Sequence, residues 1–333
     1  MRKTSGIVTI LLSIILVSCL WFGGLFVTSL IDNDSTVVSN NGNNTVNKNE
    51  NTNKESLTTT NINKLDNSKL FHYNQLSQNE KNIYDSLLNG FINLENEITM
   101  EKIDSSSLSK IFKAVLNDHS EIFWVEKSFK YTLKDSLFDS KYCIYPNYFF
   151  DKKEIKNMNN QIQFNVDTIL NDISSLSTDS DKIKRVYETI ILQTTYDIKA
   201  YKNSDTQKIN ESQNIDSALI NKTTVCAGYA KTIHYILNRC GIETIYVTGE
   251  AGRNENTGAH AWNIVKCDGQ YYYLDATWGD PTYTLFDKEL SSISYIYLLA
   301  NDSVLNDTHK IDSTYFDYPE CTNTHERYHE YNS

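Results

Sequence analysis

Apolar residues recur every three or four positions through much of the region that follows residue 69. Four segments share this helical spacing, namely 77–91, 108–116, 151–173 and 179–195. Ser77 and Glu80 open the first of them with a capping-box pattern, which marks a helix start. Shorter apolar pieces typical of strands lie around 123–125, 129–131 and 142–145. Residues 69–175 are therefore predicted to form a mainly helical accessory region.

The pattern changes in the last third of the chain, where one helix precedes a set of strands. Val225 to Arg239 has helical spacing, and Gly241 follows as a residue suited to a left-handed cap. Strand-like alternation then appears in three pieces, 244–248, 259–266 and 271–277. A Gly- and Asn-rich loop is predicted over 249–258. A helix followed by an antiparallel sheet is an α+β arrangement, and residues 176–322 are predicted to form this domain.

Asp268-Gly269 is the strongest short hairpin signal in the chain, and it determines how the last two strands pair. In the register set by this turn, Asp275 lies opposite Trp262 and His260 lies opposite Thr277. His260 and Asp275 are then diagonal neighbours on one face of the sheet, about 7 Å apart at the backbone. A slip of one residue would place them on opposite faces. The turn therefore aligns an imidazole with a carboxylate.

Cys226 stands where the helix over 225–239 is predicted to begin. A free thiol, with a pKa of about 8.5, is mostly protonated at neutral pH, so a catalytic cysteine needs activation. An imidazole that is oriented by a carboxylate provides it, because the imidazolium stabilises the thiolate. The positive end of the helix dipole would favour the thiolate further. The backbone N–H of Cys226 would serve as one oxyanion donor.

Three short blocks around these residues resemble the catalytic blocks of the transglutaminase-like superfamily. They occur in the family's order and at similar spacing: Val225-Cys226-Ala227-Gly228-Tyr229-Ala230, Gly258-Ala259-His260-Ala261-Trp262-Asn263 and Tyr273-Leu274-Asp275-Ala276-Thr277-Trp278. Tyr196-Asp197 and Asp280-Pro281 also look familiar, so the resemblance covers roughly 180–320. The chain is most similar to bacterial, envelope-associated members with a helical N-terminal region.

The resemblance implies a papain-like α+β core, in which a nucleophile helix packs on an antiparallel sheet. Cys226 would be the nucleophile, His260 the general base and acid, and Asp275 the residue that orients the imidazole. The family performs acyl chemistry on amides through a thioester, which water resolves to hydrolysis and an amine resolves to transamidation. No cofactor is expected, and the expected partner is a protein or peptide substrate, with a wall peptide, a surface protein and a host protein left open. A catalytically inactive binding module that keeps the fold is the alternative.

Three aromatic residues complete the candidate site. Tyr196, just before the first block, is the candidate for a second oxyanion donor, with capping of core structure by its hydroxyl as an equal alternative. Trp262 and Trp278 flank the triad in sequence. They are expected either to form walls of the acyl site or simply to pack beside it.

The chain of 333 residues is acidic, with a net charge of −11 and no run of basic residues. This balance argues against a nucleic-acid surface. Residues 32–68 are rich in Asn, Thr, Ser and Lys and contain little that would offset the entropy of ordering. They are predicted to be a disordered linker, and residues 323–333 are predicted to be a polar tail.

Residues 1–31 are predicted to be a membrane anchor or signal segment. Arg2 and Lys3 precede an uncharged stretch over residues 5–31, which is long enough to span a bilayer as a helix. The flanking charges predict a single-pass protein of the cell membrane with the catalytic domain outside. Lipidation of Cys19, which follows the lipobox-like Leu16-Val17-Ser18, and cleavage of a secretory signal are the alternatives.

Two further patterns do not lead to a predicted site. His325-Glu326-Arg327-Tyr328-His329 matches the HExxH motif of zinc proteases, but no apolar stripe surrounds it, so no metal is predicted. An outside location permits disulfides among Cys143, Cys240, Cys267 and Cys321, with three possible pairings. Free thiols are favoured for these four residues, none of which forms a metal-like CxxC pair.

Overall fold

The computed structural model describes residues 26–29, 67–135, 140–202, 206–253, 256–283 and 292–332. No helix within these ranges has the length and apolar character needed to cross a membrane. Most of the predicted N-terminal segment, with Cys19, and nearly all of the predicted linker lie outside the described residues. Residues 26–29, which the sequence analysis included in an uncharged helix, form strand β1 (Phe26–Ser29) instead. Aromatic and β-branched residues in this piece suit an extended strand.

The accessory region combines helices with a four-stranded sheet. Its helices are α1 (Gln78–Asn93), α2 (Ser105–Asp118) and α3 (Lys152–Ile173), preceded by 3-10 turns η2 (Asn67–Lys69) and η3 (Tyr73–Gln75). Its strands run in the order β1-β3-β4-β2, with β2 (Ile98–Glu101), β3 (Val125–Asp135) and β4 (Ser140–Tyr148). The capping box of Ser77 and Glu80 is confirmed. The short strand pieces predicted from sequence are parts of the long β3–β4 hairpin.

The C-terminal half contains a helical layer and a five-stranded antiparallel sheet. The helices are α4 (Asp179–Gln193), α5 (Ile198–Lys202), α6 (Thr206–Glu211), α7 (Ile215–Leu219), α8 (Cys226–Arg239), α9 (Ala276–Gly279), α10 (Asp302–Leu305) and α11 (Tyr328–Tyr331). The sheet order is β10-β9-β8-β7-β11, with β7 (Thr244–Arg253), β8 (Asn256–Cys267), β9 (Gln270–Leu274), β10 (Leu298–Ala300) and β11 (His309–Ile311). A short parallel pair, β5 (Thr195–Tyr196) and β6 (Thr223–Thr224), precedes α8. The predicted α+β class is confirmed.

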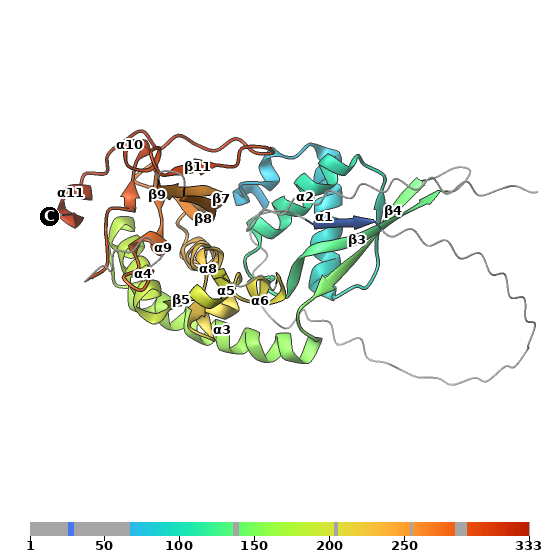
Figure 1. The fold of residues 1–333 in the computed structure, drawn as a ribbon, viewed down its shortest axis with the longest axis horizontal. Helices are drawn as coiled ribbons and strands as arrows, with labels where there is room; N and C mark the ends of the chain where they lie inside the picture. The colour runs from blue at the N-terminus through green and yellow to red at the C-terminus, as the bar shows by residue number, and fades with distance from the viewer. Residues whose placement is uncertain are drawn as a thin grey trace, which may run out of the picture.

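Figure 1 shows the arrangement of these elements. Helices α1 and α2 and the β3–β4 hairpin occupy one end, the sheet of β7, β8 and β9 lies toward the other, and α8 lies beside that sheet. Helix α3 runs along both halves and packs on α4 and α7. One core cluster of buried residues includes members of both halves, such as Leu87, Phe112, Tyr187 and Tyr229. A second cluster, which includes Trp262 and Trp278, lies within the C-terminal half.

The hairpin register predicted from Asp268-Gly269 is confirmed. Cys267 pairs with Gln270, and the same register continues to Asn263 opposite Leu274. Both turn residues have positive φ angles, 50° for Asp268 and 80° for Gly269, as a tight two-residue turn requires. The predicted continuation to Thr277 is wrong, because β9 ends at Leu274.

Chain direction changes directly after β9 because Asp275 caps the short helix α9. Its side chain accepts hydrogen bonds from the backbone N–H groups of Thr277, at 2.9 Å, and Trp278, at 3.2 Å. An aspartate in this position satisfies N–H groups that the first turn of a helix leaves unpaired. Asp275 is thus fixed both by the strand that precedes it and by the helix that follows it.

The segment over 249–258 was predicted to be a loop, but it belongs largely to strands β7 and β8. Gly249 pairs with His260 on one side and with Ile311 of β11 on the other. A Cβ atom at Gly249 would lie 2.1 Å from the carbonyl oxygen of Lys310. Glycine here therefore permits a close approach between strands and does not mark a turn.

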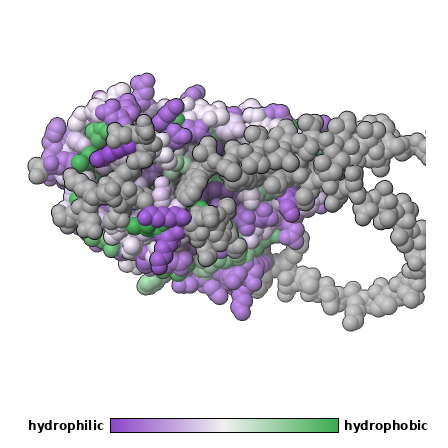
Figure 2. Space-filling model, viewed as in Figure 1, coloured by the Kyte–Doolittle hydropathy of each residue, from purple (hydrophilic) through white to green (hydrophobic). Residues whose placement is uncertain are grey.

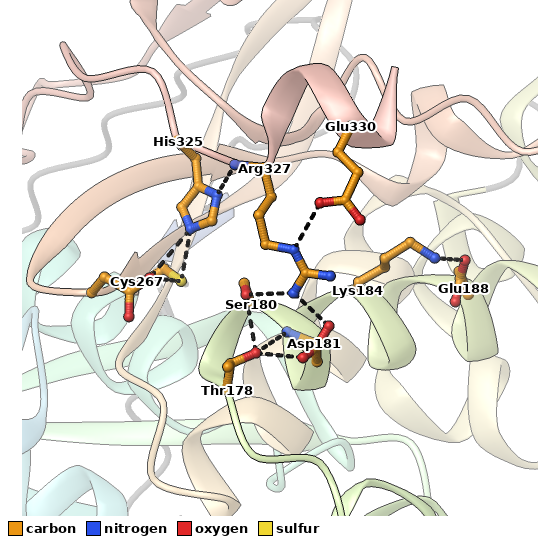
Figure 3. Close-up of polar contacts among 10 residues, drawn as sticks. Thr178, Ser180, Asp181, Lys184, Glu188, Cys267, His325, Arg327 and Glu330 are labelled. Atoms are coloured by element: carbon orange, nitrogen blue, oxygen red, sulfur yellow. Dashed lines mark hydrogen bonds and ion pairs between the residues drawn. The ribbon is translucent and has the colours of Figure 1, made fainter. Parts of the chain in front are cut away.

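The C-terminal segment, predicted to be a polar tail, packs against the domain. Figure 3 shows how two of its residues attach it. The Arg327 guanidinium donates to Asp181 at 2.5 Å and to Ser180 at 3.1 Å, at the start of α4. His325 is buried against the β8–β9 turn, with its Nε2 atom 3.5 Å from the Cys267 sulfur. The polar composition of this segment did not indicate the packing, because it does not show that the polar side chains bind partners on the domain.

Figure 2 shows one face of the molecule, on which the described atoms are mostly hydrophilic or intermediate. Hydrophobic residues on this face occur in small, separate groups. Single exposed apolar residues of this kind are normal on protein surfaces.

Candidate active site

Cys226 is the first residue of α8, as predicted, and its side chain is buried. Val225 precedes the helix in an extended conformation, and its backbone N–H donates to the carbonyl of Ser212. The first N–H groups of a helix have no partner within it, so the start of α8 directs positive partial charge toward the sulfur. Ala227, Ala230, Tyr246 and Ala261 pack around Cys226.

His260 and Asp275 meet as the hairpin register predicts. Nε2 of His260 lies 2.8 Å from Oδ2 of Asp275, and their side chains are 5% and 1% exposed. Since the carboxylate takes Nε2, Nδ1 is the nitrogen left for the Cys226 side chain, which interacts with the imidazole and raises its pKa. The structure therefore brings the three predicted triad residues together.

Charge in this cluster is strongly perturbed. Burial would lower the pKa of His260, but the Asp275 carboxylate and the Cys226 side chain raise it to about 10. Burial would raise the pKa of Asp275, but His260 and His309 hold it well below its usual range. At neutral pH the pair is consequently an imidazolium and a carboxylate, which is the state that stabilises a neighbouring thiolate.

His309 is the functional candidate that the sequence analysis missed. Its Nε2 atom lies 3.1 Å from the same Oδ2 of Asp275 that binds His260. Both side chains of this second pair are 1% exposed. His309 begins β11, far along the chain from the three blocks and in a polar stretch that carries no recognisable motif. Only the pairing of β11 with β7 brings it to the triad.

The two tryptophans lie beside the histidine pair. The Trp262 ring stacks on His260, with centroids 5.8 Å apart, and contacts His309 edge-on at 5.1 Å. Trp278 lies 6.1 Å from His260 and 4.6 Å from His309. Trp262 also lines a cavity of about 430 Å³ together with His309 and Tyr273. Both tryptophans therefore enclose the imidazoles, and their role as walls of an acyl site stays a prediction.

Tyr196 lies in strand β5 and is 4% exposed. Its ring contacts Tyr229 and Tyr283, with centroids 6.4 and 4.7 Å away. Burial raises the pKa of Tyr196, and the charge of Cys226 raises it further. The residue is thus a neutral phenol within electrostatic range of the sulfur, and its role as an oxyanion donor stays a prediction.

Cys267 and His325, which Figure 3 shows, form with Asp268 a second group that has the composition of a metal site. The hydrogen bonds argue against a metal there. Nδ1 of His325 accepts the backbone N–H of Arg327 at 3.1 Å, so Nε2 carries the ring proton in the neutral imidazole. That nitrogen then donates to Asp268 and Cys267 and has no lone pair for a metal. His329, the other histidine of the HExxH match, is not part of this group.

The cysteines that were candidates for disulfides are free thiols, as favoured from the sequence. Cys143, Cys240, Cys267 and Cys321 are unpaired, and so is Cys226. Burial raises the pKa of Cys267 and of Cys321 to about 12, with further contributions from nearby aspartates. These two thiols are therefore protonated at neutral pH.

A helix-borne thiol that faces an imidazole–carboxylate pair on an antiparallel sheet defines a cysteine-triad domain with a papain-like α+β core. Residues 167–276 match the model of the Transglutaminase-like superfamily, and this range contains Cys226, His260 and Asp275. The chain therefore carries a transglutaminase-like domain, which at the level of the family is a cysteine-enzyme domain.

Two curated relatives match part of the chain. The chain is 26% identical to human Kyphoscoliosis peptidase over 157 residues, which cover 44% of this chain and 23% of the relative. It is 26% identical to the mouse protein of the same name over 128 residues, covering 36% and 18%. The chain thus spans less than a quarter of the length of the curated relatives that it matches.

Solved structures of similar proteins match more loosely. One described as the crystal structure of a TGase has a TM-score of 0.34 and 15% identity, covering 60% of this chain and 53% of its own. A putative cysteine protease from Cytophaga hutchinsonii has a TM-score of 0.28 and 14% identity, covering 46% and 63%.

Proposed function

We propose that this domain hydrolyses amide bonds of protein or peptide substrates through a thioester on Cys226. The observation that carries the proposal is the buried arrangement of Cys226, His260 and Asp275, in which the imidazole bonds the Asp275 carboxylate and interacts with the Cys226 side chain. Each residue has the environment that its role requires: the thiol at a helix start, the imidazole protonated and the carboxylate ionised.

The reaction follows from these positions. The Cys226 thiolate attacks the amide carbonyl carbon, and the tetrahedral oxyanion forms next to the start of α8. The C–N bond then breaks, and the leaving amine takes a proton from His260. Water attacks the resulting thioester while His260 accepts its proton, which releases the acid and regenerates the Cys226 thiolate beside the His260 imidazolium. Asp275 holds the ring orientation throughout and stays ionised.

Hydrolysis is proposed over transamidation on two grounds. An external amine must compete with water, which is present at a far higher concentration. The curated relatives are named peptidases, and they match part of this chain at 26% identity. Transamidation remains the competing outcome of the same thioester.

We propose further that the catalytic domain acts outside the cytoplasm. Residues 5–25 contain no charged side chain and follow Arg2 and Lys3, a pattern that favours insertion into a membrane with the basic end inside. Free cysteines are compatible with this location, since the buried thiols outside the site, Cys143, Cys267 and Cys321, are protected from oxidants by the fold.

Thiol labelling and turnover test the function together. Iodoacetamide at neutral pH is expected to alkylate Cys226 first among the cysteines, as mapped by peptide mass spectrometry. Cys226→Ala is expected to abolish release of new amino groups from a casein digest by at least 100-fold. Addition of a fluorescent cadaverine would reveal transamidation as incorporation of label into casein. On intact cells, a membrane-impermeant maleimide is expected to reach Cys226.

Matched variants separate the alternatives. Cys321→Ala, at a buried thiol outside the site, controls for loss of a cysteine and should leave turnover unchanged. Wild-type protein that binds casein without cleaving or labelling it, and with Cys226 no more reactive than Cys240, would establish a binding module instead. Protection of Cys226 from the maleimide until cells are lysed would contradict the proposed location.

A further inference from the structure

Asp275 serves two imidazoles, of which the triad uses only one. Oδ2 lies 2.8 Å from Nε2 of His260 and 3.1 Å from Nε2 of His309. Oδ1 is occupied by the backbone N–H groups of Thr277 and Trp278. A carboxylate accepts hydrogen bonds only, so both histidines must present N–H groups to the same oxygen.

The state of His309 differs from that of His260. Burial lowers the pKa of His309 below its ordinary value, although Asp275 opposes this, so the ring is neutral at pH 7. Its single proton then lies on Nε2, toward Asp275, and its Nδ1 accepts from the Thr308 hydroxyl at 2.8 Å. The charged groups that face His309 are Asp275 and His260, with the Tyr297 ring 6.0 Å away. His309 is therefore a neutral donor held in one tautomer.

We propose that His309 is a positioning residue of the catalytic site: it holds Oδ2 of Asp275 so that His260 keeps its orientation toward Cys226. The inference rests on the proposed function and extends the triad by one residue from β11.

Removing His309 would affect the reactivity of Cys226 in two ways that oppose each other. A carboxylate with one donor fewer would bind the His260 proton more tightly, which alone would favour the thiolate. A buried charged oxygen that lacks a partner is costly, however, so Asp275 turns or admits water and no longer fixes His260. Because directed hydrogen bonds to Oδ2 are what align the ring, we expect the loss of position to dominate.

Simple packing is the competing explanation for His309, since its ring contacts Trp262 and Trp278. Glutamine and asparagine at this position distinguish the two. A glutamine side chain can place its amide N–H near the Nε2 position of histidine, whereas asparagine is too short to do so. Both are neutral amides, so they disturb the packing of a buried histidine in a similar way.

The experiment measures the rate of iodoacetamide alkylation at Cys226 between pH 5 and pH 9 in the full chain, with peptide mapping. In His309→Asn, the acid limb of the profile is expected to move up by about one pH unit, with an alkylation rate about ten-fold lower at pH 6. His309→Gln is expected to recover at least half of the lost rate. His234→Leu, at a buried histidine that bonds Ser120 away from the site, should leave the profile unchanged.

His260→Ala separates this inference from the proposed function. It should slow alkylation at least as much as His309→Asn. If His260→Ala leaves the Cys226 profile unchanged, the triad itself is not activating the thiol and the proposed function fails. If His260→Ala slows alkylation but His309→Asn and His309→Gln match each other, or His309→Asn moves the acid limb downward, then His309 has no positioning role. Urea midpoints for all variants show whether each remains folded.

Discussion

Asp275 carries the greatest density of polar contacts in the site. Its Oδ2 accepts from two imidazoles and its Oδ1 from two backbone N–H groups. A carboxylate that is 1% exposed would be strongly disfavoured in its charged form without such partners. The side chain therefore links the catalytic chemistry to the stability of the fold, and the two are expected to change together when it is altered.

Asp275→Asn tests this link through the pH dependence of stability. Asparagine keeps the cap of α9 but cannot balance an imidazolium. Because folding lowers the pKa of Asp275, the ionised carboxylate stabilises the folded protein above the unfolded pKa of 3.8, and this stabilisation is lost in acid. Because folding raises the pKa of His260, the imidazolium stabilises the folded protein fully below the unfolded pKa of 6.5, and this stabilisation is lost as the pH rises through about 10. The free energy of unfolding of the wild type should therefore exceed that of the variant most between about pH 4 and pH 6.5.

The expected difference there is about 3 kcal/mol, the scale found when one partner of a buried pair is removed. Urea unfolding at pH 6 and pH 9.5 measures it. A difference that is equal at both pH values would show that the imidazolium does not depend on Asp275.

Single residues also show what the sequence could reveal of the site. Cys226, His260 and Asp275 were predictable because each lies in a short block and because the Asp268-Gly269 turn fixes their register locally. His309 was not, since its place depends on β11 reaching β7 across the sheet. Tertiary placement of this kind leaves no periodic or motif signal in the chain.

At the scale of elements, Gly249 misled the loop prediction and also shapes the site. Helices with capping boxes and regular spacing, such as α1 and α3, were predicted to within a residue or two because local rules determine them. Gly249 was taken as a loop signal, but it lies inside β7. It is a glycine because β11 approaches too closely to leave room for a Cβ atom. Loop-like composition and close packing between strands cannot be distinguished from one sequence.

Gly249→Ala is expected to displace β11 and, with it, His309. A Cβ atom would meet the Lys310 carbonyl at 2.1 Å and Trp262 at 2.9 Å, so the strand must move. The free energy of unfolding should fall by about 2 kcal/mol, the scale of overpacking. Alkylation of Cys226 at pH 6 should slow several-fold.

Gly241→Ala is the matched control for that variant. Gly241 has a φ of 87° at the end of α8, with nothing within 4 Å of an added Cβ. Alanine there should cost about 1 kcal/mol through backbone strain alone and should leave alkylation unchanged. Equal alkylation in both variants would show that the position of β11 does not affect the site.

At the scale of the whole molecule, the accessory region and the catalytic domain share a core. The sequence suggested a boundary near residue 175, between the predicted accessory region and the predicted catalytic domain. Lys113 of α2 bonds Asp312, just after β11, at 2.5 Å, and one buried cluster includes residues of both halves. Composition along the chain does not show which surfaces become buried against each other.

A shared core predicts one cooperative unfolding transition for the full-length protein. Trp124 lies in the accessory core, and Trp262 and Trp278 lie in the catalytic half. The fourth tryptophan, Trp21, is replaced by phenylalanine in both variants. Tryptophan fluorescence of Trp21→Phe/Trp124→Phe then reports on the catalytic half, and that of Trp21→Phe/Trp262→Phe/Trp278→Phe reports on the accessory half.

Each probe should be compared with circular dichroism of the same variant, because the substitutions themselves change stability. Within each variant the two curves are expected to coincide in urea, since neither half can expose its part of the common core without uncovering the other's. The urea midpoints from fluorescence and from circular dichroism would differ by more than about 0.5 M if the halves unfolded separately. With urea slopes of about 1–3 kcal/mol/M, a difference of this size would establish two independent units. The accessory region would then be an attached domain, and the triad would depend on the C-terminal half alone.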